Sequence, residues 1–333
     1  MPSDLHPVRR LSQLPAPPEG KSGWPWTEES AVLPETMPDG GEWPAISIAI
    51  PSYNQGGYLE ETIRSVLLQG YPNLEVVVID GGSSDGSAGI IRKYDAWLDY
   101  WVSEQDDGQC DAINRGFAKT GGEIFNWLCS DDFLTRNALE AVALAFREGG
   151  GCDVVAGACY CQYDDEPERS ESRLARSGEW EKVPYMAGIW QPSCFYRRAL
   201  IGRDGLVRMD LNFCMDRELW CYLFKQGGRW RWIEQVLSHY RFTGENKSVV
   251  GGQKIIDEIG RIYQGYVKEL VSLPWVLRRV WLPLVLASKQ DGAGGFGKGQ
   301  RWLSQAVAAA LLAVYPRHHV RALQKEFYEY SVW

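Results

Sequence analysis

The sequence has no long run of apolar residues and no secretory signal pattern. No stretch approaches the roughly 20 apolar residues that span a bilayer. The N-terminus carries Asp4, His6, Arg9 and Arg10 where a signal peptide would begin its apolar core. The sequence therefore predicts neither a membrane-spanning nor a secreted protein, and we expect it to work in the cytoplasm.

Paired cysteines and the common phosphate-binding glycine motifs are also absent. The eight cysteines among 333 residues include no CxxC pair, so neither a zinc site nor a disulfide framework is indicated. The P-loop pattern, GxxxxGK completed by Ser or Thr, does not occur, and no GxGxxG follows the first apolar run. These absences argue against a P-loop ATPase and against a dinucleotide-binding enzyme.

Basic residues are too few for a general nucleic-acid binder. Lys and Arg number 35 against 43 Asp and Glu, a formal net charge of −8, whereas affinity for phosphate backbones depends on clustered Lys and Arg. The charge is unevenly divided, because residues 251–333 carry +5 and the first 250 residues carry −13. The C-terminal part is therefore the part suited to an anionic surface.

Proline content and apolar periodicity predict three regions. Residues 1–45 contain nine of the 17 prolines and little periodic pattern, which predicts an extended N-terminal arm held by Trp24 and Trp26. Residues 46–250 form the predicted main domain. Residues 251–333 form a predicted helical C-terminal extension.

Short apolar runs alternate with amphipathic segments through the main domain. Three runs predict buried strands at 46–50, 74–79 and 124–129. Intervening patterns predict helices at 59–67, 87–94 and 109–118 and a strand at 100–103. This alternation is typical of an α/β fold with an open, mostly parallel central sheet and flanking helices. A polar excursion is expected over 160–182 and a packed helix after residue 213.

Polar residues follow each predicted strand at its carboxyl end. These residues are Ser52, Tyr53 and Asn54 after the first strand, Asp80 after the second, and Asp131 and Asp132 after the third. Ligands of open α/β sheets bind beyond the carboxyl ends of the strands. One such end alone is equally typical of a helix cap, but three of them on one edge favour a binding site.

The adjacent carboxylates Asp131 and Asp132 indicate a divalent cation. Like charges a few ångströms apart repel and raise each other's pKa unless a cation lies between them. Oxygen ligands suit Mg²⁺ or Mn²⁺, which commonly take their remaining ligands from waters and from a substrate's phosphates. The pair therefore suggests a nucleoside diphosphate bridged to the protein through a metal.

Four motifs in order resemble the family 2 inverting glycosyltransferases of the GT-A fold, of the type that serves bacterial surface polysaccharides. They are Ser52-Tyr53-Asn54, the run from Val78 to Gly86, Ser130-Asp131-Asp132, and the run from Met215 to Trp220. The resemblance covers roughly residues 44 to 250. It implies that Asp80 and the residues around Tyr53 contact the nucleobase. It also implies that Asp131 binds ribose, that Asp132 binds the metal diphosphate, and that Asp216 is the catalytic base.

The resemblance further implies which residues lie near the sugar acceptor and which cationic residue contacts the diphosphate. Gln191 and Glu218 are expected on the acceptor side, and Glu218 is the second candidate for the base. Many relatives carry a His where Thr243 stands in this sequence. That departure leaves the diphosphate contact to Arg241 or Lys247.

The residues and the resemblance together predict a metal-dependent inverting glycosyltransferase with Mn²⁺ or Mg²⁺ as cofactor. It would move a sugar from a nucleoside diphosphate donor, most simply a UDP-sugar, to a glycan or lipid-linked glycan acceptor in polysaccharide biosynthesis. No covalent nucleophile is required, because the donor is already activated. A sugar nucleotidyltransferase and a non-catalytic glycan- or partner-binding module of the same fold are the alternatives.

Two apolar segments of the C-terminal extension, 272–288 and 302–315, are too short to span a membrane. Basic residues and tryptophans accompany them, a composition suited to helices in the interface of an anionic membrane. A helical cap over the main domain or a homodimer contact fits the same composition. Peripheral attachment to the inner face of the membrane is thus one of three interpretations.

Overall fold

The computed structural model describes residues 8–163, 170–173, 189–266, 273–290 and 295–315, together with positions 320, 321, 323, 324 and 328. The chain divides into two compact units. The first unit comprises residues 1–177, 188–212 and 226–243, and the second comprises 178–187, 213–225 and 244–333. The predicted domain boundaries at 45 and 250 stay a prediction, because compactness alone does not show which segments fold or act together.

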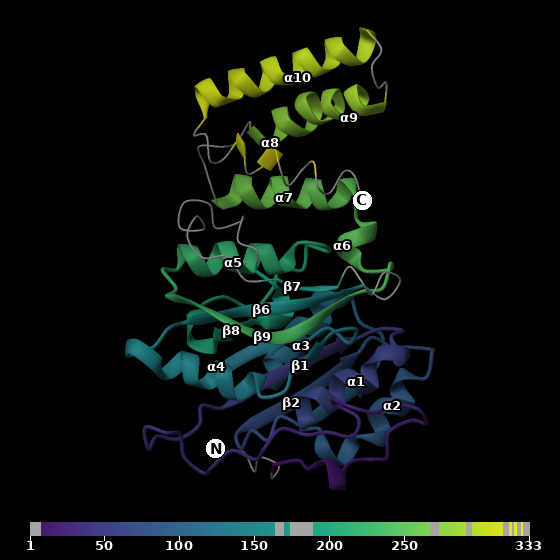
Figure 1. Ribbon diagram of the computed structural model, residues 1–333, viewed down its shortest axis with the longest axis vertical. Coiled ribbons are helices and arrows are strands. Elements are labelled where there is room, and N and C mark those ends of the chain that lie inside the picture. The colour runs from purple at the N-terminus through teal and green to yellow at the C-terminus, as the bar shows by residue number, and fades with distance from the viewer. Residues whose placement is uncertain are drawn as a thin grey trace. The chain divides into compact units, whose positions relative to one another are not determined.

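The first unit is built on a mixed sheet (Figure 1). Its strands are β1 (Ile46–Ser52), β2 (Leu74–Asp80), β3 (Tyr100–Ser103), β4 (Ile124–Trp127), β5 (Phe133–Leu134), β6 (Val154–Tyr163), β7 (Glu171–Arg173), β8 (Cys194–Arg197) and β9 (Trp230–Phe242). Their order is β3-β2-β1-β4-β8-β6-β9-β5, with β7 paired to β6. Strands β1 to β4 pair in parallel, as predicted, and β8 joins them to β6 through antiparallel pairing.

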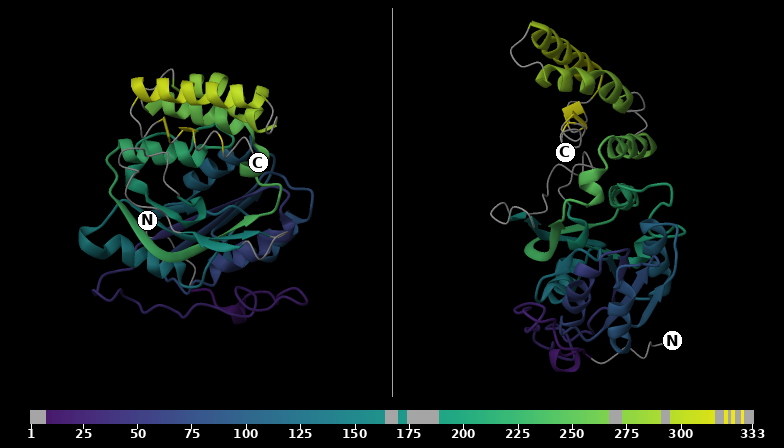
Figure 2. Two further views of the ribbon diagram at one scale, coloured as in Figure 1. Left: turned by 45° about the horizontal axis from the view of Figure 1, so that its top comes forward. Right: turned by 90° about the vertical axis from the view of Figure 1, so that its right-hand side faces the viewer.

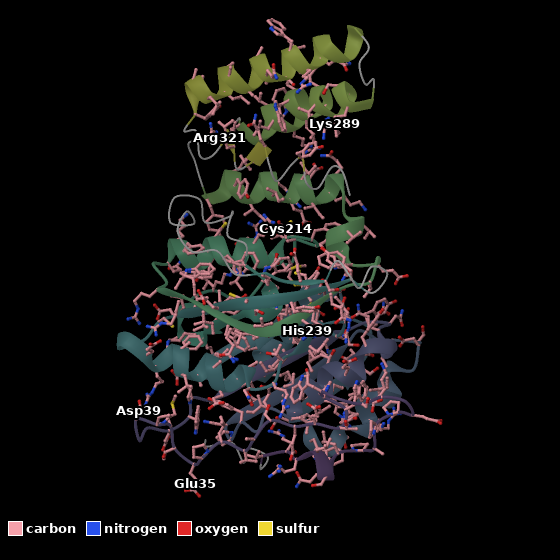
Figure 3. The ribbon with its side chains drawn as sticks, in the orientation of Figure 1. Glu35, Asp39, Cys214, His239, Lys289 and Arg321 are labelled. Carbon is pink, nitrogen blue, oxygen red and sulfur yellow. The ribbon has the colours of Figure 1, made fainter. Side chains whose placement is uncertain are left out.

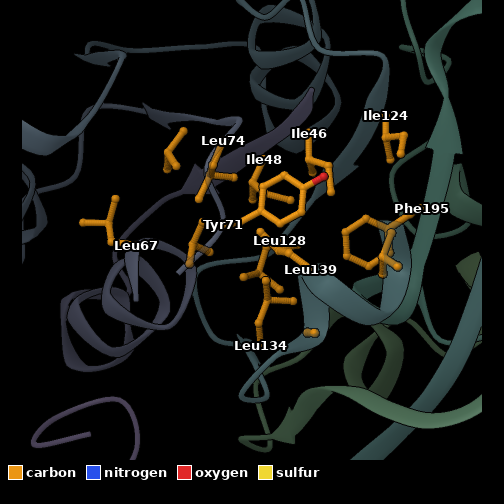
Figure 4. Close-up of a cluster of buried hydrophobic side chains, with 14 of the residues drawn as sticks. Ile46, Ile48, Leu67, Tyr71, Leu74, Ile124, Leu128, Leu134, Leu139 and Phe195 are labelled. Atoms are coloured by element: carbon orange, nitrogen blue, oxygen red, sulfur yellow. The ribbon is translucent and has the colours of Figure 1, made fainter. Parts of the chain in front are cut away.

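Helices cover both faces of the parallel strands, which explains why these strands are apolar throughout. One face carries α1 (Gly56–Leu67), α2 (Ser87–Lys93) and α4 (Ala138–Arg147), whose buried side chains join a core with Ile48 and Val76 (Figure 4). The other face carries α3 (Gln109–Lys119). A Cβ at Gly116 of α3 would lie 2.6 Å from the Cβ of Ala49, so glycine is needed for this close packing.

The N-terminal arm is fastened to the first unit by hydrogen bonds to its backbone. The indole Nε1 of Trp24 donates to the carbonyl of Leu134 at 2.8 Å. Arg64 of α1 is fully buried, and its guanidinium donates to the carbonyls of Pro15 at 2.9 Å, Pro25 at 3.1 Å and Trp26 at 2.8 Å. The Trp26 side chain is also buried, with the Arg64 guanidinium 5.5 Å from its ring, so the predicted anchoring by Trp24 and Trp26 is confirmed.

The structure corrects two expectations about the middle of the chain. The prediction that residues 160–182 form an exposed excursion is wrong for residues 160–163. Strand β6 continues to Tyr163, and the side chains of Cys161 and Tyr163 are buried. Residues 171–173 form β7, and the rest of that stretch, 164–169 and 174–182, lies outside the described residues. The third predicted strand ends at Trp127, two residues earlier than expected.

The second unit is helical in the part that the structure describes (Figure 2). Its helices are α5 (Met215–Lys225), α6 (Lys247–Val250), α7 (Gln253–Tyr266), α8 (Leu273–Val276), the π-helical turn η8 (Leu277–Trp281), α9 (Leu282–Gln290) and α10 (Gly295–Val314). The predicted helix after residue 213 and the helical extension are confirmed. Over the described ranges, none of the helices combines the length and the apolar content needed to cross a bilayer.

Candidate functional site

Asp80, at the end of β2, is fully buried and held in one orientation. Its Oδ1 accepts a hydrogen bond from the Ser83 hydroxyl at 2.5 Å, and its Oδ2 accepts from the Ser83 backbone N–H at 3.0 Å and the Ser103 hydroxyl at 2.7 Å. Ser52 lies opposite Asp80 in the register of β1 and β2. The first two predicted strand ends therefore lie side by side, as expected for neighbouring parallel strands.

The loops that follow β1 and β2 are hydrogen-bonded to each other. The Asn54 backbone N–H donates to the Ser83 hydroxyl at 2.7 Å, and the Ser84 N–H donates to the Asn54 side-chain oxygen at 2.9 Å. Asn54 adopts a φ of +51°, a left-handed conformation that asparagine tolerates better than most residues. Tyr53 beside it is 64% exposed, so its ring is accessible to a ligand.

The loop after β4 joins the same edge through residues that sequence reasoning missed. The Ser130 hydroxyl donates to the Gln55 side-chain oxygen, and the Gln55 side chain is also hydrogen-bonded to Asp131. The Thr62 hydroxyl of α1 lies 2.8 Å from the Ser130 carbonyl and 2.6 Å from the Asp132 carbonyl. Gln55 follows the first polar strand end directly, and that position was the available signal.

Asp131 and Asp132, both buried, form a cluster with the partly exposed Cys129. The thiol sulfur and one carboxylate oxygen from each acid all lie within 4.8 Å of one another. Asp131 is 8% exposed, and burial raises its pKa. Asp132 is 2% exposed, and burial followed by repulsion from Asp131 raises its pKa well above the usual range. Two carboxylates and a thiol are groups that can bind a divalent cation. A bound cation would favour the charged forms of both acids, which burial otherwise disfavours.

Arg241 of β9 brings positive charge to this cluster and is itself buried. Its Nη2 lies 2.9 Å from an oxygen of Glu61, and its Nη1 donates to the Asp131 carbonyl at 2.7 Å. Its backbone N–H donates to Oδ1 of Asp132 at 3.0 Å, and the guanidinium stacks over the Phe133 ring at 4.4 Å. Arg241 therefore holds the loop after β4 that carries Asp131 and Asp132, here called the acidic loop. The predicted contact of Arg241 with a diphosphate stays a prediction.

Gln191, predicted on the acceptor side, adjoins the cluster through Cys129. Its amide Nε2 donates to the Trp127 carbonyl at 2.6 Å, and its Oε1 lies 3.9 Å from the Cys129 sulfur. Gln109 of α3 donates to the same sulfur at 3.4 Å. Cys129 therefore lies between the acids and two amide side chains, and its place at the end of the predicted strand 124–129 was the only sequence signal for it.

The side chain of His239 in β9 packs against aromatic rings of the first unit (Figure 3). Its ring stacks on Phe133 with centroids 4.1 Å apart and packs at 4.9 Å from the ring of Tyr160. Burial lowers the pKa of His239 to about 4. The imidazole is therefore neutral at physiological pH, and it contributes no positive charge to the acidic cluster.

Asp216, Glu218 and Lys247 belong to the second unit, whereas the acidic cluster belongs to the first. Asp216 lies in the first turn of α5, its Oδ1 accepts from the Arg217 N–H at 2.7 Å, and burial raises its pKa. Glu218 is buried and accepts a 2.5 Å hydrogen bond from the Tyr266 hydroxyl of α7. Lys247 is the first residue of α6. Their predicted roles in catalysis, acceptor contact and diphosphate contact stay predictions.

A family model described as Glycosyl transferase family 2 matches residues 47–219, a range that includes Asp80, Asp131, Asp132 and Asp216. This protein belongs to glycosyl transferase family 2. The family assignment confirms the predicted glycosyltransferase and decides against a nucleotidyltransferase.

Relatives of this family 2 glycosyltransferase occur among curated bacterial proteins. An uncharacterized glycosyltransferase of Rickettsia prowazekii (strain Madrid E) is 34% identical over 69% of this chain and 73% of its own length. TuaG of Bacillus subtilis (strain 168), described as a teichuronic acid biosynthesis glycosyltransferase, is 33% identical over 62% of this chain and 82% of its own. A Rickettsia typhi relative is 35% identical, but the match spans only 39% of either protein.

Solved structures of two proteins share the fold of this family 2 glycosyltransferase. Residues 1–349 of S. aureus TarS superpose with a TM-score of 0.55 at 17% identity, over 86% of this chain and 90% of that one. The mannosyltransferase PcManGT from Pyrobaculum calidifontis gives a TM-score of 0.55 at 16% identity, over 87% and 86% of the two chains. These similarities confirm the predicted GT-A type of α/β fold.

Proposed function

We propose that this family 2 glycosyltransferase transfers a sugar, with inversion at the anomeric carbon, from a nucleoside diphosphate sugar to a glycan acceptor. The observation that carries the proposal is the meeting of three loops, which bring Asp80, Asp131 and Asp132 to the carboxyl edge of one sheet. The solved TarS structures include complexes with UDP-GlcNAc and with UDP, and PcManGT was solved with GDP-Man and Mn²⁺. TuaG's description supports a role in polysaccharide biosynthesis.

The proposed donor contacts follow from what each side chain can accept or donate. A carboxylate only accepts hydrogen bonds, so the oriented Asp80 would take an N–H of the base, as uracil in a UDP-sugar offers. The exposed Tyr53 ring is available to stack on that base. Asp131 would accept hydrogen bonds from the ribose hydroxyls. Lys247 or Arg241 would contact the diphosphate.

The proposed cofactor is a divalent cation held by Asp132, with Asp131 and Cys129 beside it. When bound, such a cation neutralises the charge that develops on the leaving diphosphate. Carboxylate oxygens suit both Mg²⁺ and Mn²⁺, but a sulfur ligand is softer and favours the transition metal. We therefore propose Mn²⁺ as the better fit to this cluster.

The proposed reaction is a single displacement. The acceptor hydroxyl oxygen forms a bond to the anomeric carbon while the bond from that carbon to the diphosphate oxygen breaks, and the hydroxyl proton passes to Asp216. A base must be ionised to take a proton, and the raised pKa of Asp216 makes it a stronger base than an exposed aspartate. Gln191 and Glu218 are the proposed acceptor-side residues.

The donor is tested by thermal unfolding of the full chain with a panel of nucleoside diphosphate sugars and Mn²⁺. A donor that binds the folded state raises Tm by mass action, and a matching metal-dependent release of the nucleoside diphosphate would show catalysis. Binding without any release, with acceptor glycans present, would favour the non-catalytic module. An unchanged Tm with every nucleotide sugar of the panel would contradict the proposal.

The cation site is tested by thiol labelling, because Cys129 is the one partly exposed cysteine among eight and the other seven are buried. A thiol reagent should label the folded protein once, at Cys129, and Mn²⁺ should slow that labelling. Cys129→Ser serves as the control that removes the reactive thiol. Labelling of Cys129 at an unchanged rate in saturating Mn²⁺ would place the cation elsewhere.

A further inference from the structure

Large apolar side chains lie exposed on the C-terminal helices. Of the ten large hydrophobic residues that are exposed in the described part of the chain, five lie between residues 275 and 314. These five are Trp275 (60% exposed), Val280 (36%), Trp302 (69%), Leu303 (45%) and Val314 (74%). Tryptophan at such exposure is costly in water, since burying an aromatic side chain removes a large apolar area from solvent. The concentration on one segment therefore indicates a surface that is covered in use.

The exposed residues of α10 form an apolar stripe along the helix. Its exposed positions recur at helical spacing and, beyond Arg301, are almost all apolar: Trp302, Leu303, Ala306, Ala309, Ala310, Ala313 and Val314. The polar Ser304 is buried instead, and its hydroxyl bonds back to the Arg301 carbonyl at 2.8 Å. The less exposed positions Val307, Leu311 and Leu312 are apolar as well, so α10 is apolar on both sides. A helix of this kind is normally covered all round, and the outer side of α10 therefore indicates a surface that a partner covers.

The charge of the segment that carries this stripe is almost all of one sign. Residues 273–315 contain five Lys and Arg against a single acidic residue. Arg279 and Arg301 are exposed, and Lys289 of α9 lies with its ammonium 4.3 Å from the Tyr328 ring (Figure 3). Arg278 is engaged by Asp257 of α7 at 2.8 Å. The exposed basic residues are thus available to an anionic partner.

We propose that α8 to α10 bind the surface of an anionic phospholipid membrane, with the α10 stripe entering the interface and Arg279 and Arg301 contacting lipid phosphates. Trp and Leu suit the boundary between headgroups and acyl chains, and each basic residue near an anionic surface adds to the attraction. A second copy of the chain fits less well, because symmetric pairing of this surface would bring like charges together. Nucleic acid fits less well because the stripe offers almost no hydrogen-bond donors.

The test is co-sedimentation of the full chain with vesicles of phosphatidylcholine and with vesicles of phosphatidylcholine and phosphatidylglycerol in equal parts. We expect binding to the anionic vesicles that weakens in high salt. Arg279→Ala with Arg301→Ala should lower partitioning about 25-fold at low salt, about fivefold for each residue. Trp302→Ala with Leu303→Ala should lower it about tenfold or more at any salt concentration. Met209→Ala and Arg136→Ala, exposed residues of the first unit, should leave it unchanged.

Folding and activity are separated from membrane binding in the same experiment. All the replaced side chains are exposed, so circular dichroism melting and donor hydrolysis without vesicles should match the wild type. Failure of the wild-type protein to sediment with anionic vesicles at low salt would overturn the proposal. A dimer in light scattering that Trp302→Ala with Leu303→Ala dissociates, without vesicle binding by the wild type, would also overturn it and assign the stripe to a second copy.

Discussion

Replacement of Asp132 by Asn is expected to stabilise the metal-free protein at neutral pH. Asp132 is 2% exposed, and burial and the neighbouring Asp131 disfavour its charged form. Asn has nearly the same shape and keeps a side-chain oxygen for the 3.0 Å hydrogen bond from the Arg241 backbone N–H. The substitution therefore removes a charge without opening a cavity.

The separation of the two acids sets the scale of the repulsive part of the effect, which adds to the cost of burying the charge. Their ligand oxygens lie within 4.8 Å, and two full charges at that distance repel by roughly 3.5 kcal/mol at an effective dielectric constant of about 20. The nearby Arg241 guanidinium offsets part of this repulsion. We expect a net gain of about 1 to 3 kcal/mol, with Tm rising by about 2 to 4 °C for each kcal/mol.

The gain should depend on pH in a defined direction. Because the pKa of Asp132 is raised on folding, the folded wild type binds more protons than the unfolded chain, and its stability rises as the pH falls through the folded-state pKa. Protonated Asp132 is neutral, as Asn is. The advantage of Asp132→Asn should therefore be present at neutral pH and disappear towards about pH 4, the usual pKa of Asp.

Thermal unfolding in EDTA across this pH range measures the effect, with Glu35→Gln as the control because Glu35 is exposed. Mn²⁺ with UDP should raise the Tm of the wild type and leave that of Asp132→Asn unchanged. A destabilised Asp132→Asn protein, or a gain that persists unchanged at about pH 4, would refute the charge argument. A variant that keeps the Mn²⁺-dependent shift would refute the assignment of Asp132 as a metal ligand.

Four further predictions concern other parts of the molecule. Asp216→Asn should keep donor affinity and lower turnover by about 10² or more, since proton transfer is lost and binding contacts are not; wild-type turnover would move the base to Glu218. Activity of the wild type should also be lost as the pH falls, because protonated Asp216 cannot take up a proton. Since burial raises the pKa of Asp216, this loss should begin at a higher pH than it would for an exposed aspartate. Arg64→Leu should lower the free energy of unfolding in urea by about 3 to 5 kcal/mol, because it leaves the buried carbonyls of Pro25 and Trp26 and the partly buried carbonyl of Pro15 without their donor. A loss below 1 kcal/mol, about that of removing an exposed ion pair, would contradict the anchoring role. Gly116→Ala should destabilise by about 1 to 3 kcal/mol, whereas Gly89→Ala, with open space around it, should not.

The sequence by itself determined the parallel half of the sheet and the polar ends of its strands. Apolar runs such as Ile46 to Ile50 have one stable placement, a strand buried on both faces, and the helical patterns between them cover those faces. Asp80 follows such a run directly and Asp131 follows another after Ser130, so their arrival at one edge of the sheet follows from parallel order. Local pattern carried this information because each element is specified by residues that are neighbours in the chain.

The tertiary structure alone decided what depends on residues far apart in the sequence. Strand β6 pairs in parallel with β9 about 80 residues later, and no local pattern specifies a partner at that distance. Arg241 reaches the Asp132 carboxylate and the Asp131 carbonyl, more than 100 residues earlier in the chain, only after β9 is in place. The sequence marked 302–315 as an apolar segment, but only packing decided which of the apolar residues of α10 face outward.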